Sequence, residues 1–410
     1  MPFAVYLLGL AVFAQGTSEF MLSGLVPGIA ADLGVSIPAA GLLTSAFAAG
    51  MVVGAPLMAA LSLRLSRRAA LLAFLIVFLA VHVLGAVTTS YEVLVATRVV
   101  AALANAGFLA VALATAVALA PSDAKGRATS VLLGGVTLAC VAGVPGGALL
   151  GEVWGWRSAF WAVALALVPA IVAVLKSVPG GAPGASSDGT SAVETGASSG
   201  GASRPRGGSV RGELRVLRRP RLLVLLLLGA LVNGATFCTF TYLAPVLTGA
   251  SGIGSSWMPA MLALFGAGSF AGVTISGRIA DRRPVPLLVV GGLALAAGWA
   301  AFALAAGAAV PAIVLVLVQG TLSFAVGSTL ITQVLYAATG APTMGGAFAT
   351  AAFNVGATLG PGLGGLAIGA GLGLRSPLWV SAAMVGLALA VAGIAGLRVR
   401  LNRMEVEVPR

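Results

Sequence analysis

The chain has 410 residues, of which 59% are hydrophobic and only 8% are charged. Soluble domains carry about 25% charged residues, so this composition excludes an ordinary soluble fold. The formal net charge of +12 could indicate a nucleic-acid-binding protein. The basic residues lie between long apolar segments, however, which is typical of membrane topology. We therefore expect a membrane protein with the lipid bilayer, and no nucleic acid, as its partner.

The apolar segments are long enough to cross a hydrocarbon core as helices, which takes about 20 residues each. There are twelve, near residues 4–28, 39–63, 69–88, 93–119, 128–151, 158–178, 222–248, 257–280, 285–307, 310–338, 343–370 and 375–397. A β-barrel would show short alternating segments instead. The sequence predicts an all-α membrane protein of twelve transmembrane helices, the first of which is too long for a cleavable signal peptide.

The basic residues predict the orientation of these helices. All but three of the 23 Lys and Arg residues fall on one side of the expected membrane, the exceptions being Arg98, Arg157 and Arg375. Basic loops stay in the cytoplasm, so both termini are expected there, and the protein in the inner (cytoplasmic) membrane. Nothing indicates an oligomer, and we expect a monomer.

The chain divides into two six-helix bundles, 1–178 and 221–397, with a tail at 398–410. Between them, 179–220 is a linker whose first part is rich in Gly, Ala and Ser and cannot bury a core. The halves match at a constant offset of 218 residues. The matching pairs are Gln15-Gly16 with Asn233-Gly234, Pro27 with Pro245, Gly50 with Gly268, Gly54 with Gly272, and Arg64 with Arg282. This repeat predicts two parallel bundles related by an axis along the membrane normal.

Several short motifs lie at corresponding places in the repeat. They are Gly277, Asp281 and Arg282 after the eighth helix; Arg64, Arg67 and Arg68 after the second; Gly143, Pro145, Gly146 and Gly147 in the fifth; and Gly360 and Pro361 in the eleventh. Glycines allow close helix packing, and a proline inside a helix bends it. Asp281 and the neighbouring arginines either hold the protein in one conformation or only set the orientation of its helices in the membrane.

These motifs, together with Gly16-Thr-Ser-Glu-Phe20 and Ala104-Asn-Ala-Gly-Phe108, resemble the major facilitator superfamily. Within it the chain is similar to the twelve-helix drug:proton antiporters, in particular actinobacterial chloramphenicol-resistance exporters. The resemblance covers the whole chain except the linker. It implies two six-helix bundles, a central cavity, and export of a small molecule driven by a proton gradient.

Glu19 is the only acid expected well inside a membrane helix. A charged carboxylate at bilayer depth costs roughly 3 kcal/mol or more, so such a residue is a functional candidate. Arg98 is expected at similar depth on the fourth helix, where the family motif has its arginine. We expect Glu19 to take up and release the proton that drives transport, and Arg98 to be its positively charged partner. The alternatives are a structurally paired acid and an arginine that extends to the membrane surface.

Other side chains are candidates for the substrate cavity. They are Gln15, Phe20, Asn105, Phe108, Asn233, Phe237, Tyr242, Gln319, Phe324 and Asn354. Each polar member could instead link helices, and each aromatic one could simply pack. His82, on the third helix, is expected away from the cavity helices, as a structural histidine rather than a proton relay.

The favoured function is proton-coupled efflux of a small amphiphilic drug, most directly chloramphenicol, with no cofactor. A sugar or metabolite exporter of the same superfamily is the alternative. A membrane-embedded transferase is a remote one, because one His and one intramembrane acid do not make a clustered active site. No phosphate-binding Gly-Lys-Ser/Thr loop is present, so ATP-driven transport is not encoded in the chain.

Overall fold

The computed structural model describes residues 2–62, 65–121, 124–178, 219–280, 284–338 and 345–406. Within these ranges the regular secondary structure is helical, and no strand occurs. Twelve helical segments in these ranges are long and apolar enough to cross a membrane. The predicted fold class and the predicted number of spans are confirmed.

The N-terminal half contains the helices of the first six predicted spans. They are α1 (Phe3–Phe20), α2 (Leu22–Leu33), α3 (Ile37–Ser62), α4 (Arg67–Val87), α5 (Tyr91–Leu119), α6 (Lys125–Leu138), a π-helical turn η1 (Ala139–Gly143), α7 (Val144–Trp154) and α8 (Trp156–Ser177). One continuous hydrophobic core joins these helices except α7, with large members such as Phe47, Phe78 and Phe160.

The C-terminal half repeats this arrangement. Its elements are α10 (Pro220–Thr241), α11 (Leu243–Gly249), the 3-10 turn η3 (Ser255–Trp257), α12 (Met258–Ile279), α13 (Pro284–Ala305), α14 (Ala309–Ala337), α15 (Gly345–Ala367), the π-helical turn η4 (Ile368–Leu372) and α16 (Ser376–Val406). A second core, built around Trp299, Phe302 and Phe265, holds them together and includes Val144 and Ala148 of α7.

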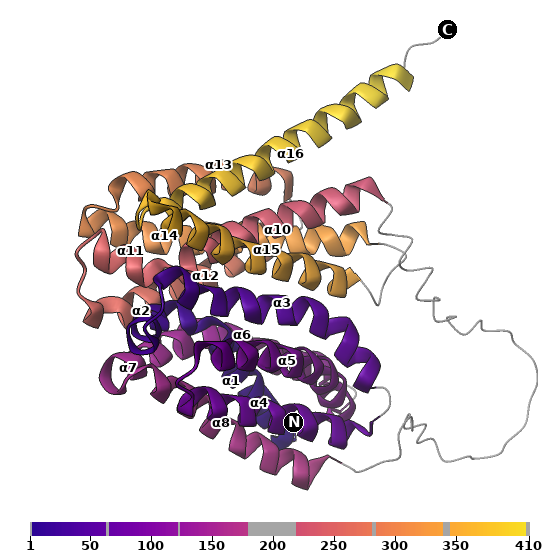
Figure 1. The fold of residues 1–410 in the computed structure, drawn as a ribbon. Coiled ribbons are helices and arrows are strands. Elements are labelled where there is room, and N and C mark those ends of the chain that lie inside the picture. Colours follow the sequence, from indigo (N-terminus) through magenta and orange to yellow (C-terminus); the bar gives the residue numbers. More distant parts are fainter. Residues whose placement is uncertain are drawn as a thin grey trace, which may run out of the picture.

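The two halves lie side by side, with the helices of both running in roughly the same direction (Figure 1). They meet along α3 and α15, and along α7, η1 and α12, while α2 contacts α11 at one end. Any substrate path through the molecule is therefore bounded by one wall from each half.

Several predicted spans are interrupted helices. The first changes from α1 to α2 at Met21, the seventh from α10 to α11 at Tyr242, and the eleventh ends in the π-helical turn η4. The fifth contains the π-helical turn η1 just before Pro145. A proline removes one backbone donor, and a wider turn before it accommodates the lost bond.

The glycines of the fifth span face α1. A side chain at Gly147 would lie 3.1 Å from the Cβ of Met21, and one at Gly135 would lie 2.7 Å from the Gly9 carbonyl oxygen. Gly143 faces Thr17 in the same way. Gly146, in contrast, has open space beside it. Small residues thus allow the fifth span to pack against the helix that carries Glu19.

Some predictions differ from the structure or fall outside it. The last helix continues to Val406, beyond the boundary expected at 397, although its apolar span ends at Gly396. Arg64, Asp281 and Arg282 lie outside the described residues, as does nearly all of the linker at 179–220. The latch proposed for Asp281 therefore stays a prediction.

Candidate functional site

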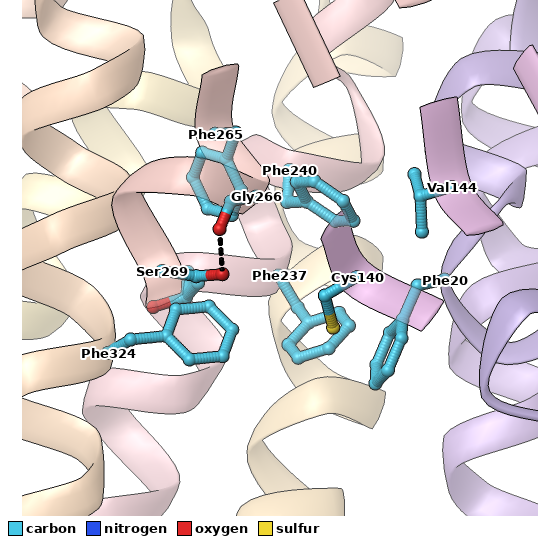
Figure 2. Close-up of a pocket in the computed structure, with 10 residues that line it drawn as sticks. Phe20, Cys140, Val144, Phe237, Phe240, Phe265, Gly266, Ser269 and Phe324 are labelled. Carbon is cyan, nitrogen blue, oxygen red and sulfur yellow. Dashed lines mark hydrogen bonds between the residues drawn. The ribbon is translucent and has the colours of Figure 1, made fainter. Parts of the chain in front are cut away.

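A cavity lined almost entirely by apolar groups lies between the two halves (Figure 2). Phe20, Cys140 and Val144 line it from α1, η1 and α7 of the N-terminal half. The lining from α10, α12 and α14 of the C-terminal half is Thr236, Phe237, Phe240, Phe265, Gly266, Ser269 and Phe324. The free space in this cavity is only about 20 Å³; it rises to about 340 Å³ when the open side and the gaps between the lining atoms are included. Three predicted residues, Phe20, Phe237 and Phe324, are among those that line it.

The aromatic side chains form a chain of ring contacts along the cavity. The ring centroids of Phe20 and Phe237 are 5.8 Å apart, so this contact crosses from one half to the other. Phe237 is 6.2 Å from Phe240, Phe240 is 4.8 Å from Phe265, and Phe265 is 6.3 Å from Phe324. Such tilted and edge-on pairs offer apolar faces and polarised edges to a bound molecule. Phe240 and Phe265 were not singled out from the sequence.

The two halves approach closely at Gly266. A Cβ atom there would lie 2.6 Å from the Cys140 carbonyl oxygen, so only glycine fits without movement. The hydroxyl of Ser269 donates to the Gly266 carbonyl at 2.7 Å, as Figure 2 shows. The Ser269 hydroxyl is thus occupied within α12, and this side of the cavity stays apolar.

The other predicted cavity residues do not line this cavity. Most of them bond across or along helices: Asn105 to the Met51 sulfur at 3.6 Å, Asn233 to the Phe353 carbonyl at 2.7 Å, Tyr242 to the Pro361 carbonyl at 2.9 Å, Gln319 to the Leu295 carbonyl at 3.1 Å, and Asn354 to the Thr350 carbonyl at 3.0 Å. Phe108 is fully buried in the N-terminal core. Gln15 is buried and its amide has no partner among the described residues. Asn105, Asn233, Tyr242 and Gln319 thus bond to other helices, as in the helix-linking alternative, whereas Asn354 bonds only within α15.

Glu19 and Arg98 lie in one interior region but form no direct ion pair; the ion pair in the described part of the chain is on the surface. Glu19 is partly accessible, and the charge of Arg98 acts on it through space. The Cys140 thiol, which lines the cavity, also lies within the electrostatic reach of Glu19. Phe20, the residue after Glu19, lines the cavity, so Glu19 lies beside the cavity wall.

Arg98 is almost completely enclosed, with 1% of its surface exposed. Its guanidinium donates to the Ser18 hydroxyl at 2.8 Å and to the Ser18 carbonyl at 2.7 Å. It also lies 4.6 Å from the ring centroid of Phe47. The Nε–H of Arg98 has no acceptor among the described residues. Arg98 thus has one nitrogen, Nε, without an acceptor, while both of its Nη groups bind the residue before Glu19.

His82 joins the same group, contrary to the expectation that it lies away from the cavity helices. Its Nε2 is 2.6 Å from the Ser18 hydroxyl oxygen, and its Nδ1 is 2.7 Å from the Phe78 carbonyl oxygen. Both ring nitrogens are therefore bonded, as expected for a structural histidine. This contact could not be predicted from the sequence, because it depends on how α4 packs against α1.

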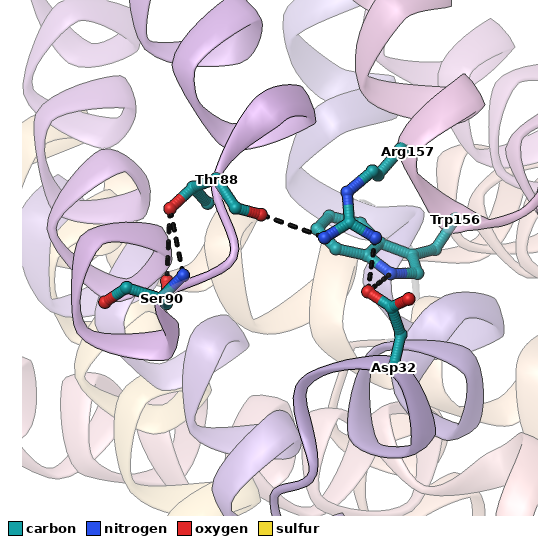
Figure 3. A network of polar contacts seen from close by, with 5 residues as sticks. All are labelled: Asp32, Thr88, Ser90, Trp156 and Arg157. Carbon is teal, nitrogen blue, oxygen red and sulfur yellow. Dashed lines mark hydrogen bonds and ion pairs between the residues drawn. The ribbon is translucent and has the colours of Figure 1, made fainter.

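A surface network ties three segments at one end of the N-terminal half (Figure 3). Arg157 forms an ion pair with Asp32 and donates to the Thr88 carbonyl at 2.9 Å. The Trp156 indole donates to Asp32 at 3.1 Å. The hydrogen bond from Arg157 holds the pKa of the Asp32 carboxyl below its ordinary value. This network fixes the end of α2 against the start of α8.

The remaining motif residues lie at helix ends or contact backbone. Arg67 and Arg68 begin α4, where Arg67 is exposed, and Gly277 is exposed near the end of α12. Gly360 packs against the backbone of Gly234. No group of three or more metal-ligating side chains occurs in the described ranges, and Cys140 and Cys238 are free thiols.

Comparison with known proteins gives consistent similarities. The sequence profile of the Major Facilitator Superfamily matches residues 8–350. The chain is 56% identical over 392 residues to a chloramphenicol resistance protein of Streptomyces lividans, covering 96% of both chains. It is 35% identical to the inner membrane transport protein YdhP of Escherichia coli K12, covering 93% of both.

Among solved structures, the fold is similar to a bacterial homologue of the human lysosomal transporter Spinster in an inward-facing, unoccupied conformation. The TM-score is 0.73 at 18% identity, with 95% of this chain and 94% of the other covered. At this identity the likeness concerns the fold.

Proposed function

We propose that this chain, which belongs to the major facilitator superfamily, exports chloramphenicol or a similar small amphiphile in exchange for protons. It is a multi-pass membrane transporter rather than an enzyme. The observation that carries this proposal is the combination of an aromatic cavity between the halves with a half-buried acid, Glu19, next to the lining residue Phe20. The Streptomyces relative, matched along nearly its whole length, supports the choice of drug.

The lining of the cavity favours an amphiphile over a sugar. Its rings offer stacking surfaces, whereas its hydroxyl groups, on Thr236 and Ser269, already bond to helix carbonyls. A sugar exporter would need several free donors and acceptors there, because an unpaired buried hydroxyl is costly. The space left between the lining side chains is about 20 Å³, far below the roughly 300 Å³ of the smallest ligand pockets, so binding requires the aromatic side chains to move apart.

Glu19 is the proposed proton carrier and Arg98 its electrostatic partner. In the described part of the chain, no other acid lies in the interior of a membrane span; Glu92 and Glu152 lie at helix ends. A proton on Glu19 removes the charge that Arg98 attracts, and substrate entering beside Cys140 would alter the surroundings of the same carboxyl. Binding of a proton and binding of substrate can thus oppose each other through the Glu19 side chain.

Exchange of a neutral drug for one proton moves positive charge inward. A membrane potential then adds about 2.3 kcal/mol per charge per 100 mV to the driving force. We further propose that the transporter works as a monomer in the cytoplasmic membrane, with both termini inside and no cofactor. Reporters fused within 185–200 should read cytoplasmic and one near Gly252 external; the reverse pattern would contradict this orientation.

Drug accumulation in a sensitised host tests the proposed function. Cells that produce the protein should accumulate less chloramphenicol than cells with an empty vector, and an uncoupler that dissipates the proton gradient should abolish the difference. Equal accumulation at verified membrane expression would contradict the proposal. Reduced sugar accumulation with unchanged drug accumulation would favour the metabolite alternative instead.

A further inference from the structure

Ser18 lies where α1 is interrupted. The helix ends at Phe20, Met21 separates it from α2, and carbonyls in a last helical turn lack their usual amide donors. The Ser18 carbonyl accepts from Arg98 Nη2 at 2.7 Å, and its hydroxyl accepts from Nη1 at 2.8 Å. The interruption thus provides a two-pronged acceptor for the fork of Arg98, one residue before Glu19.

The direction of each hydrogen bond around Ser18 follows from its partners. A guanidinium can only donate, so the Ser18 oxygen accepts from Arg98. The Phe78 carbonyl can only accept, so His82 Nδ1 carries a hydrogen. The hydroxyl hydrogen of Ser18 then points to His82 Nε2, 2.6 Å away, which must offer its lone pair. The sequence of donors runs from Arg98 through Ser18 to His82 and ends at the Phe78 carbonyl.

The His82 ring has no freedom to change this role. It is 1% exposed, stacks on Phe78 at a centroid distance of 4.2 Å, and lies 5.6 Å from the Phe160 ring. A doubly protonated ring would donate from Nε2 and leave the Ser18 hydrogen without its acceptor, next to the buried charge of Arg98. The ring therefore serves as a neutral acceptor.

We propose that Ser18 and His82 are positioning residues that hold the Arg98 guanidinium away from a direct pair with Glu19 while keeping it within electrostatic reach. The proposal rests on the proposed proton exchange at Glu19. With both Nη groups bound to Ser18, the prongs of Arg98 are held on the residue before Glu19, and the structure shows no ion pair between Arg98 and the carboxylate. Glu19 stays free to take up and release a proton. Without the Ser18–His82 support, Arg98 pairs with Glu19 directly and fixes it in the charged state.

The first test reads the hydrogen-bond arrangement without transport. The chain has a single histidine, so histidine labelled with 15N gives one pair of ring signals in protein purified without a polyhistidine tag. Near neutral pH, Nδ1 should be protonated and Nε2 unprotonated. Ser18→Ala should shift the Nε2 signal. Ser381→Ala is the matched control, because it removes a buried hydroxyl that links α16 to α10 in the other half. A protonated Nε2, or an Nε2 signal unchanged by Ser18→Ala, would overturn the proposal.

The second test separates positioning from packing. Reconstituted vesicles measure uphill efflux under an imposed pH gradient and, separately, exchange of substrate at equal pH. Ser18→Ala and His82→Asn should lower uphill efflux at least about tenfold, since a hydrogen bond to a charged group is lost, and exchange should stay within about twofold. His82→Gln should recover most of the uphill efflux, because its amide oxygen reaches the position of Nε2, which that of Asn does not.

Parallel loss of both transport modes, or equal activity of the Gln and Asn variants, would show a packing role and overturn the proposal. Wild-type vesicles without uphill drug efflux would instead contradict the proposed function. In that case the histidine signals alone decide whether the Ser18–His82 arrangement exists.

Discussion

The two halves of this transporter share a scaffold but contribute different chemistry to the cavity between them. At the repeat positions of Glu19 and Arg98, the C-terminal half has Phe237 and Val316. The N-terminal half thus contains the buried acid and its cation, whereas four of the five phenylalanines that line the cavity come from the C-terminal half. The N-terminal residues that line the cavity itself are Phe20, Cys140 and Val144, and Glu19 and Arg98 are not among them. We call the N-terminal side, with Glu19 and Arg98, the charged wall, and the phenylalanine-rich C-terminal side the aromatic wall.

The physical cost of burying charge explains why such a division is favourable. Each ionisable group inside the membrane has to be supported by partners, and Arg98 already requires Ser18, His82 and the face of Phe47. A second set in the other half would double that cost. An aromatic wall requires only packing, and its side chains can move apart to accept substrates of varied shape.

The largest effect is expected from removing the titratable group of the charged wall. Glu19→Gln preserves size and most hydrogen bonding but cannot carry a proton, so uphill efflux should fall to the background level. Substrate exchange at equal pH should continue, because the aromatic wall is intact. Efflux from energised vesicles measures this, and wild-type uphill rates in the variant would exclude Glu19 as the carrier.

The second largest effect is expected at Gly266, where the two walls touch. Gly266→Ala places a methyl group 2.6 Å from the Cys140 carbonyl oxygen, and such overpacking costs about 1–3 kcal/mol. We expect a lower unfolding temperature and slower transport, because α12 and η1 must separate. Gly386→Ala on α16, which points into open space, is the control and should unfold like the wild type. Equal unfolding temperatures for both variants would contradict this close approach.

A milder change tests the aromatic wall. Phe265→Leu keeps an apolar side chain but removes ring contacts with Phe240 and Phe324, which are worth about 0.5–1.5 kcal/mol each. The KM for drug should rise about two- to tenfold, with the pH dependence of transport unchanged. Phe270→Ala, on the exposed side of the same helix, should leave KM unaltered. A change in pH dependence without a change in KM would reverse the assignment of the two walls.

The smallest effect is expected at the surface network of the N-terminal half. Asp32 has a lowered pKa because Arg157 bonds to its ionised form, so its contribution to stability is present above its unfolded pKa of about 3.9 and is lost as the pH falls through the lower folded value. The pair is solvent-accessible, and we expect Asp32→Asn to cost at most about 1 kcal/mol near neutral pH. Unfolding curves of both proteins should converge on acidification, and a constant difference down to about pH 2 would contradict this origin.

The sequence predicted the parts of the molecule that depend on local composition. Twelve apolar stretches give twelve spans, and the glycines around Pro145 correctly indicated a distorted, closely packed helix. The expected cavity was only partly found. Tyr242 and Asn233 point to helix carbonyls instead, and Phe240 and Phe265 line the cavity without having been predicted. Which face of an entirely apolar helix turns inward is decided by packing, and periodicity gives little signal when both faces are apolar. The contact between His82 and Ser18 depends on the same packing.

Proton release on substrate binding tests the division between the two walls most directly. Purified protein in a weakly buffered solution is titrated with chloramphenicol while the pH is recorded and binding is measured in parallel. The wild type should release protons on binding, Phe265→Leu should release as many at higher drug concentration, and Glu19→Gln should bind drug without releasing any. Undiminished proton release by Glu19→Gln would contradict the account, because the proton would then leave from another group.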